Sequence, residues 1–125
     1  MGYYSTIKGS ITFEPGITLA EAKESLLEQH VNSDKDTYLI LEGFEDASKD
    51  ELLNVISPRW EESIKVYTLI PELKELVKSL PDRTYRGYLL IEGEGYGDGQ
   101  PDLWRLKVKD GKVFEVFPEL IWPED

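Results

Sequence analysis

The chain has 125 residues, with 25 acidic against 14 basic side chains and a net charge of −11. This length suits a single domain around one hydrophobic core, and 40% hydrophobic residues are too many for a disordered chain. The absence of cysteine excludes disulfides, thiolate metal sites and thiol nucleophiles. No apolar run approaches the roughly 20 residues of a membrane span, and the N-terminus lacks the features of a signal peptide, so we expect a cytoplasmic protein with no membrane partner.

The negative charge is concentrated in the first half of the chain. Residues 1–63 carry 13 acids against 5 bases, whereas residues 64–125 carry 12 against 9. Nucleic-acid binding depends on Lys and Arg, so direct binding of nucleic acid is not expected. The acids either keep the protein soluble or attract a basic protein surface.

The first elements have clear local signals. Residues 3–13 alternate between apolar and polar side chains, which predicts a half-buried strand that Pro15-Gly16 then ends. Thr18 and Glu21 have the spacing of a capping box, in which both side chains satisfy free N–H groups at a helix start. A helix over residues 19–30, with one apolar stripe facing a sheet, should follow.

The middle of the chain predicts two strands and a helix. Residues 37–44 form a nearly continuous apolar run, which indicates a strand in a central position of the sheet. Residues 51–57 fit either a short capped helix or a strand returning beside the previous one, and we favour the strand. A helix over residues 68–80 follows, and Pro71 places its start at Leu69 or Ile70, because proline is tolerated in the first turn.

The last third predicts three successive strands over residues 84–93, 102–109 and 112–118. A two-residue loop at Asp110-Gly111 would put apolar and charged side chains on one face. A three-residue loop, with Gly111 as a left-handed bulge, pairs Val108 with Lys112 instead and separates the two kinds, so we predict this register. It places the following residues on one face: Trp104, Leu106, Val108, Phe114 and Val116.

These elements define an α+β fold. Their order is β-α-β-β-α-β-β-β, within a single domain over residues 1–125. We expect an antiparallel sheet of five to six strands with two helices on one face.

The stretch EGEGYGDGQPDLW, residues 92–104, is rich in glycine and carboxylates. A phosphate cradle is disfavoured, because the loop does not lead into a helix and its acids repel phosphate. Glu94, Asp98 and Asp102 are candidate calcium ligands, although their spacing does not match an EF-hand loop. The remaining interpretation is a solvated connection whose tip, including Tyr96, could contact a partner.

The sequence contains no assembly of catalytic groups. His30 is the single histidine, and at the end of the first predicted helix it suits an interaction with the helix dipole better than a role as general base. Paired carboxylates are expected by chance in so acidic a chain. We therefore predict a protein that is not an enzyme and needs no cofactor.

Two surfaces are candidate contact sites for a protein partner. The first is a set of acids in or beside the loops around the second and third strands, which form either a negative patch or a solvated surface: Asp34, Asp36, Glu45, Asp46, Asp50, Glu51, Glu61 and Glu62. The second is the sheet face with Tyr4, Arg86 and Tyr88, which marks a contact, a homodimer edge or a partly covered face. The predicted function is an acidic protein that occupies a surface of a bacterial nucleic-acid-handling or defence protein; the alternative is a small-molecule or calcium-binding module using residues 92–102.

Two stretches of the chain carry a family resemblance: GYYSTIKGSITFEPGIT at the start and GEGYGDGQPDLWRLKVKDGKVFEVFPELIWPED at the end. They resemble a family of small uncharacterised proteins of actinobacteria and their phages. The matching positions are Gly2, Tyr3, Gly9, Pro15, Trp104, Arg105, Asp110, Gly111, Ile121, Trp122 and Pro123. The resemblance implies a phage or other mobile-element origin and carries no known activity, so it transfers no functional residue.

Overall fold

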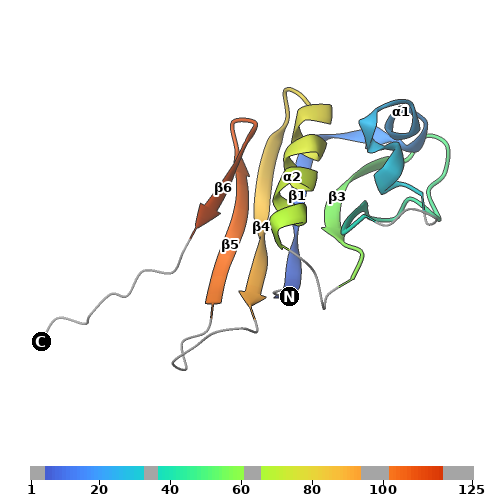
Figure 1. Ribbon diagram of the computed structural model, residues 1–125. Helices are drawn as coiled ribbons and strands as arrows, with labels where there is room; N and C mark the ends of the chain where they lie inside the picture. Colours follow the sequence, from blue (N-terminus) through green and yellow to red (C-terminus); the bar gives the residue numbers. More distant parts are fainter. Residues whose placement is uncertain (1–4, 33–36, 61–65, 94–101, 117–125) are drawn as a thin grey trace, which may run out of the picture.

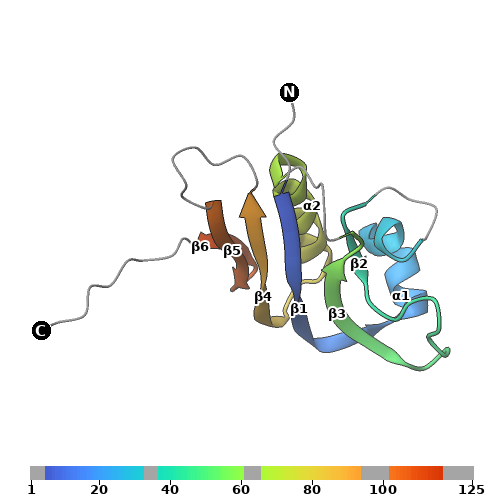
Figure 2. The same cartoon turned by 90° about the horizontal axis from the view of Figure 1, so that it is seen from below.

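The computed structural model describes residues 5–32, 37–60, 66–93 and 102–116. Within these ranges the elements follow the predicted order: β1 (Ser5–Thr18), α1 (Leu19–Glu24), the 3₁₀ helix η1 (Leu26–His30), β2 (Leu39–Leu41), β3 (Leu52–Pro58), α2 (Val66–Ser79), β4 (Thr84–Gly93), β5 (Asp102–Lys109) and β6 (Lys112–Val116). The strands form one antiparallel sheet in the order β2-β3-β1-β4-β5-β6, and α2 lies across one of its faces (Figures 1 and 2). The predicted α+β class is confirmed. None of the described helices has the length and apolar character needed to cross a membrane.

The core lies between α2 and the sheet. The alternation predicted in the first strand is confirmed, because Ile7, Ile11 and Phe13 of β1 are fully buried. They continue into buried apolar residues on β4 and β5, and α2 covers them with a stripe of its own: Leu69, Leu73, Leu76, Val77 and Leu80. One face of the central strands is therefore apolar and covered by the helix.

Strand β2 lies at an edge of the sheet, so the prediction of a central position for residues 37–44 is wrong. Strand β3 pairs with it, which confirms the prediction that residues 51–57 return beside it. Leu39 and Leu41 are buried although β2 has only one neighbouring strand, because α2 and η1 pack against it. The apolar run correctly indicated that this strand is buried. Packing of α2 and η1 against β2 provides that burial, so a second neighbouring strand is not needed.

Strand β1 passes through Pro15-Gly16, where the sequence predicted its end. Its pairing with β3 shifts register between Thr12 and Ile17, and the Glu14–Pro15 peptide bond is cis. A bulge leaves residues of one strand without ladder partners, which suits a proline that has no N–H to donate. The strand therefore continues to Thr18.

The first helix begins as predicted and ends early. Thr18 and Glu21 form the capping box, with the Glu21 N–H donating to Thr18 Oγ1 at 3.3 Å and the Thr18 N–H donating to Glu21 Oε1 at 3.4 Å. The helix then ends at Glu24, because Ser25 directs both its N–H and its hydroxyl to the Ala22 carbonyl. The η1 segment that follows leaves Leu26 61% exposed, so a continuous helix over residues 19–30 is not formed.

Helix α2 starts at Val66, three residues before the earliest start inferred from Pro71. The proline lies inside the helix, where it removes one main-chain hydrogen bond. It faces solvent, whereas Leu69 and Leu73 on either side of it are fully buried. The predicted start at Leu69 or Ile70 is therefore wrong, and the proline is tolerated on the exposed side of the helix.

The β5–β6 hairpin has a two-residue turn, so the predicted three-residue loop is wrong. Asp110 (φ 53°) and Gly111 (φ 75°) both have positive φ, and Lys109 pairs with Lys112. Such a turn matches the twist of its strands, and β6 is an edge strand with little core to cover. As a result Phe114 and Val116 lie on the face opposite α2, with 45% and 42% of their surface exposed, and not in the core.

Two glycines shape the central pair of strands. Gly9 of β1 and Gly87 of β4 both have positive φ, at 93° and 87°. A Cβ at Gly9 would lie 2.6 Å from the Tyr88 carbonyl oxygen, and one at Gly87 would lie 2.6 Å from the Ser10 carbonyl oxygen. Only glycine fits both the conformation and the space at these positions.

Candidate functional site

The face of the sheet turned away from α2 is basic, although the protein as a whole is acidic. Along β5 the side chains alternate, with Trp104, Leu106 and Val108 buried and the residues between them exposed. Cross-strand pairing brings six exposed basic residues to this side, and we refer to them as the basic face: Lys8, Arg86, Arg105, Lys107, Lys109 and Lys112. They include six of the 14 basic residues in the chain.

No ion pair among the described residues neutralises the basic face, although the exposed Glu92 lies on the same side of the sheet, opposite Leu103. Lys109 lies directly opposite Lys112 across the β5–β6 pair, and like charges in this position repel. Within the described part of the chain none of the five lysine and arginine side chains other than Arg105 takes part in an ion pair or an aromatic contact, and Arg105 stacks over the Tyr88 ring at 4.3 Å. The repulsion between the two lysines lowers the stability of the folded protein. The chain has 25 acidic residues, and an acid at either position would form an attractive pair instead.

Apolar side chains are interleaved with these charges. Leu103, Phe114 and Val116 are 36%, 45% and 42% exposed, and all three lie on the same side of the sheet as Arg105 and Lys107. A cluster of exposed apolar side chains on one face, together with arginine, is found more often at protein contact surfaces than elsewhere on the surface. The predicted contact face with Arg86 and Tyr88 is part of this surface, and Tyr4 lies outside the described residues.

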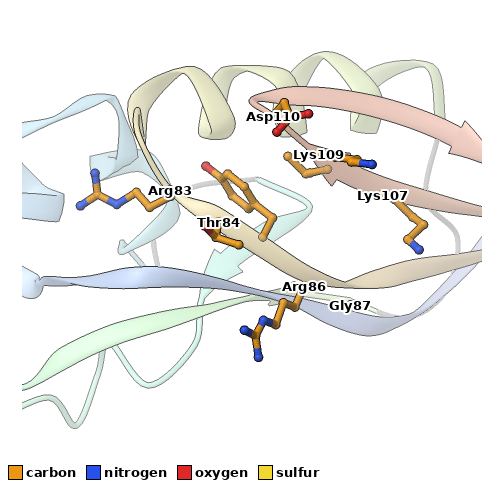
Figure 3. A pocket seen from close by; sticks show the side chains of 9 residues that line it. Arg83, Thr84, Arg86, Gly87, Lys107, Lys109 and Asp110 are labelled. Carbon is orange, nitrogen blue, oxygen red and sulfur yellow. The ribbon is translucent and has the colours of Figure 1, made fainter.

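A cavity opens where β4 and β5 separate, and we refer to it as the notch. Its volume is about 520 Å³, and its lining comes from Arg83–Gly87 of the β4 side and Lys107–Asp110 of the β5 side. In Figure 3, Arg86 and Lys107 point to the side of the sheet opposite α2, whereas Arg83 points away from Lys107. Arg83 is engaged elsewhere, since it donates hydrogen bonds to the carbonyls of Pro15 and Pro81 at 3.2 and 2.9 Å.

The predicted acidic patch is described in part. Glu45, Asp46, Asp50 and Glu51 are all exposed in the β2–β3 connection, residues 42–51, which we refer to as the acidic loop. The other four members of the predicted set lie outside the described residues: Asp34, Asp36, Glu61 and Glu62. Half of the set therefore shares one exposed loop.

The candidate calcium ligands are not brought together by any described contact. Glu94 and Asp98 lie outside the described residues, as does Tyr96, and Asp102 begins β5 opposite Gly93. Among the residues that the structure describes, no group of three or more acids or histidines is placed to hold a metal ion. Calcium binding by residues 92–102 stays a prediction.

His30 belongs to a buried polar cluster, which we refer to as the polar corner. The ring is 1% exposed, and its Nδ1 lies 2.8 Å from the Leu39 carbonyl, which can only accept, so Nδ1 carries the proton. Nε2 then accepts from the Gln29 amide at 3.1 Å. Burial lowers the pKa of His30; the hydrogen bond to the Leu39 carbonyl opposes this shift, and the positive charge of Arg59 adds to it. A neutral imidazole has no charge with which to interact with a helix dipole.

Glu72 and Arg59 complete the polar corner. The two carboxylate oxygens of Glu72 accept the N–H groups of Tyr38 and Leu39 at 3.0 and 2.7 Å, which ties α2 to the edge strand β2. Arg59 donates from Nε to the Thr37 carbonyl at 2.9 Å and from a terminal nitrogen to the Thr37 hydroxyl at 2.8 Å. Burial raises the pKa of Glu72 above its usual value, although the two N–H groups oppose this. These groups hold elements together and leave no face of the imidazole open to a substrate.

The sequence contained a signal for the basic face. Arg105, Lys107 and Lys109 alternate along a predicted strand, so they had to share one side of it. Lys8 and Lys112 join them only through strand pairing, which the sequence does not state. Net charge, which averages over the whole chain, concealed this cluster.

Comparison with known proteins gives one match. A family model described as "Family of unknown function (DUF6205)" covers residues 1–125. This match covers the whole chain, whereas the resemblance noted from the sequence was limited to the two ends. No curated protein and no solved structure matches the chain.

Proposed function

The chain belongs to a family of unknown function, so its role has to be inferred from its own surfaces, and we propose that it is a binding protein whose contact surface is the basic face. The observation that carries this proposal is the direct opposition of Lys109 and Lys112 on an exposed sheet. Repulsion between them lowers the stability of the free protein, and an anionic partner would remove that repulsion.

A protein with an acidic surface is the partner that fits this face best. The basic residues alternate with exposed Leu103, Phe114 and Val116, and a contact that buries apolar groups inside a polar rim is characteristic of protein interfaces. A polyanion such as nucleic acid would be repelled by the net charge of −11 wherever it extends beyond the basic face. The resemblance to actinobacterial and phage proteins supports a bacterial partner and a phage or mobile-element origin.

The acidic loop supports a second candidate. Glu45, Asp46, Asp50 and Glu51 are exposed in one connection and could contact a basic surface of a nucleic-acid-handling or defence protein. Such a protein would occupy the site of a phosphate backbone. The basic face is favoured because its opposed lysines lower stability, whereas acids in an exposed loop keep a protein soluble and cost little stability.

One affinity-purification experiment separates the two candidates. The native protein is compared, at low and moderate salt, with a basic-face variant (Lys8→Gln, Arg105→Gln and Lys112→Gln) and with an acidic-loop variant (Glu45→Gln, Asp50→Asn and Glu51→Gln). Each variant changes three exposed residues, so the two are matched in number. We expect a bacterial protein that the native form and the acidic-loop variant retain and the basic-face variant loses. The reverse pattern would overturn the basic face and support the acidic loop.

The calcium alternative has its own test. A ligand that binds only the folded state raises the melting temperature in proportion to the logarithm of its concentration. A calcium-dependent increase that is lost in Asp98→Asn would support a site in residues 92–102. An unchanged melting temperature up to millimolar calcium would remove this alternative.

A further inference from the structure

The strands β4 and β5 are paired over only part of their length. Their pairing runs from Gly93 opposite Asp102 to Leu89 opposite Leu106 and goes no further. Both strands nevertheless continue: β4 remains paired with β1 as far as Thr84, and β5 remains paired with β6 as far as Lys109. Residues 84–88 and 107–109 are therefore strands with a neighbour on one side only.

The two half-paired edges face each other across the notch. Its volume of about 520 Å³ lies within the range of roughly 300–1,000 Å³ that is usual for ligand sites. Main-chain N–H and C=O groups on an open strand edge are available to pair with another extended chain. At about 3.3 Å per residue, the three residues 107–109 offer an edge of roughly 10 Å.

The charged side chains around the notch are mostly basic. Arg86, Lys107 and Lys109 line it and are exposed, and Asp110 is the single acid in the lining. The Tyr85 hydroxyl is already used, since it donates to the Leu80 carbonyl at 3.0 Å. Burial raises the pKa of Tyr85 to about 12, so this group stays neutral and adds no negative charge.

We propose that the notch binds a short extended acidic segment of the partner protein by strand addition. The segment pairs its main chain with the open edge of β4 or β5, and every second side chain of the segment then points to the basic face. Carboxylates at those positions lie next to Arg86, Lys107 and Lys109. The proposal rests on the proposed function and specifies the form that the acidic partner takes.

The test uses a seven-residue peptide of alternating Glu and Val with blocked ends. Three probes accompany it: the same peptide with Lys for Glu, the same peptide N-methylated at alternate residues so that its main chain cannot pair, and a single-stranded oligothymidine of ten nucleotides. Binding is followed by fluorescence anisotropy at low and moderate salt. Protection of the amides of residues 84–88 and 107–109 is followed by hydrogen exchange.

We expect the acidic peptide to bind, the N-methylated and the Lys peptides to bind at least tenfold more weakly, and the amides of one open edge to become protected. The double variant Lys107→Gln, Lys109→Gln should lose at least tenfold in affinity. The double variant Lys74→Gln, Lys78→Gln on α2 is the matched control and should lose less than threefold, because neither lysine lines the notch or belongs to the basic face. Because all four side chains are exposed, thermal unfolding should show that each variant remains folded.

Three results would overturn the proposal. Equal binding of the N-methylated peptide would show that the basic face attracts carboxylates without strand pairing. Tighter binding of the oligothymidine than of the acidic peptide would assign the face to nucleic acid. Absence of peptide binding, together with a bacterial partner lost by the basic-face variant, would leave the proposed function standing and remove strand addition alone.

Discussion

Charged groups have hydrogen-bond partners in the polar corner, whereas two lysines face each other on the basic face. In the polar corner, Glu72 and Arg59 each satisfy main-chain groups of β2 and its approach, and His30 is held neutral between two partners. On the basic face, Lys109 faces Lys112 and the described residues offer these lysines no ion pair. Charges with main-chain partners support folding. Charges that repel each other on an exposed sheet indicate a role outside the folded chain.

The basic face keeps its arrangement only if the central strands β1 and β4 are rigid. Gly87→Ala tests this rigidity and should have the largest effect on stability. The new Cβ would meet the Ser10 carbonyl oxygen at 2.6 Å in a conformation with φ of 87°. Strain and contact together should lower the free energy of unfolding by about 3 kcal/mol. Urea denaturation measures the loss.

Gly111→Ala is the control for this prediction. Gly111 has a φ of 75°, but nothing lies within 4 Å of a Cβ placed there. It should therefore lose only about 1 kcal/mol from backbone strain. Equal losses at the two positions would mean that the central strands move to make room for the new Cβ. The notch beside them would then not be rigid.

Removal of Glu72 is the next largest effect and tests the polar corner directly. Glu72→Ala leaves the N–H groups of Tyr38 and Leu39 without their acceptor at the edge of the sheet. We expect a loss of about 2–3 kcal/mol, because hydrogen bonds to a charged acceptor are stronger than average. The exposed Glu75 on the same helix is the control, and Glu75→Ala should change stability by less than about 0.5 kcal/mol.

The sequence predicted features that depend on neighbouring residues and missed those that depend on long-range contacts. Elements specified by neighbouring residues were predicted well: the alternation in β1, and the Thr18–Glu21 capping box. The polar corner was missed because Glu72 and His30 meet only after α2 packs against η1 and β2. Long-range contacts of this kind leave no local pattern in the chain.

The hairpin register failed for a different physical reason. The prediction gave priority to separating apolar from polar side chains, whereas the Asp110-Gly111 turn determines the register. Phe114 and Val116 were assigned to the core for that reason, and their exposure is what makes the basic face a mixed surface. The same local rule that was underweighted thus produces the candidate contact site.

The contribution of the polar corner to stability should depend on pH. The pKa of His30 is lowered in the folded protein from 6.5, so below about pH 6.5 the unfolded chain gains a proton that the folded one does not. Stability from this group is complete above pH 6.5 and falls as the pH decreases. The raised pKa of Glu72 acts in the opposite direction, because the folded state takes up its proton first as the pH approaches 4.5.

The variant His30→Asn isolates the histidine contribution. Asparagine can donate to the Leu39 carbonyl as Nδ1 does, and it does not titrate. We expect the difference in unfolding free energy between the native protein and this variant to shrink between pH 7.5 and 5.5. A constant difference over that range would show that the ring already takes up a proton in the folded state.

The smallest effect should have the opposite sign and separates the two regions most clearly. Lys112→Glu replaces a repulsive pair with an attractive one across from Lys109, so it should stabilise the protein by roughly 0.2–1 kcal/mol while weakening capture of the partner. Lys49→Glu makes the same charge change in the acidic loop, where acids already surround it, and should not stabilise. If Lys112→Glu lowers stability, the repulsion that motivates the proposed function is absent. If it raises stability and leaves capture intact, the lysine pair is a tolerated defect, and the contact surface lies elsewhere.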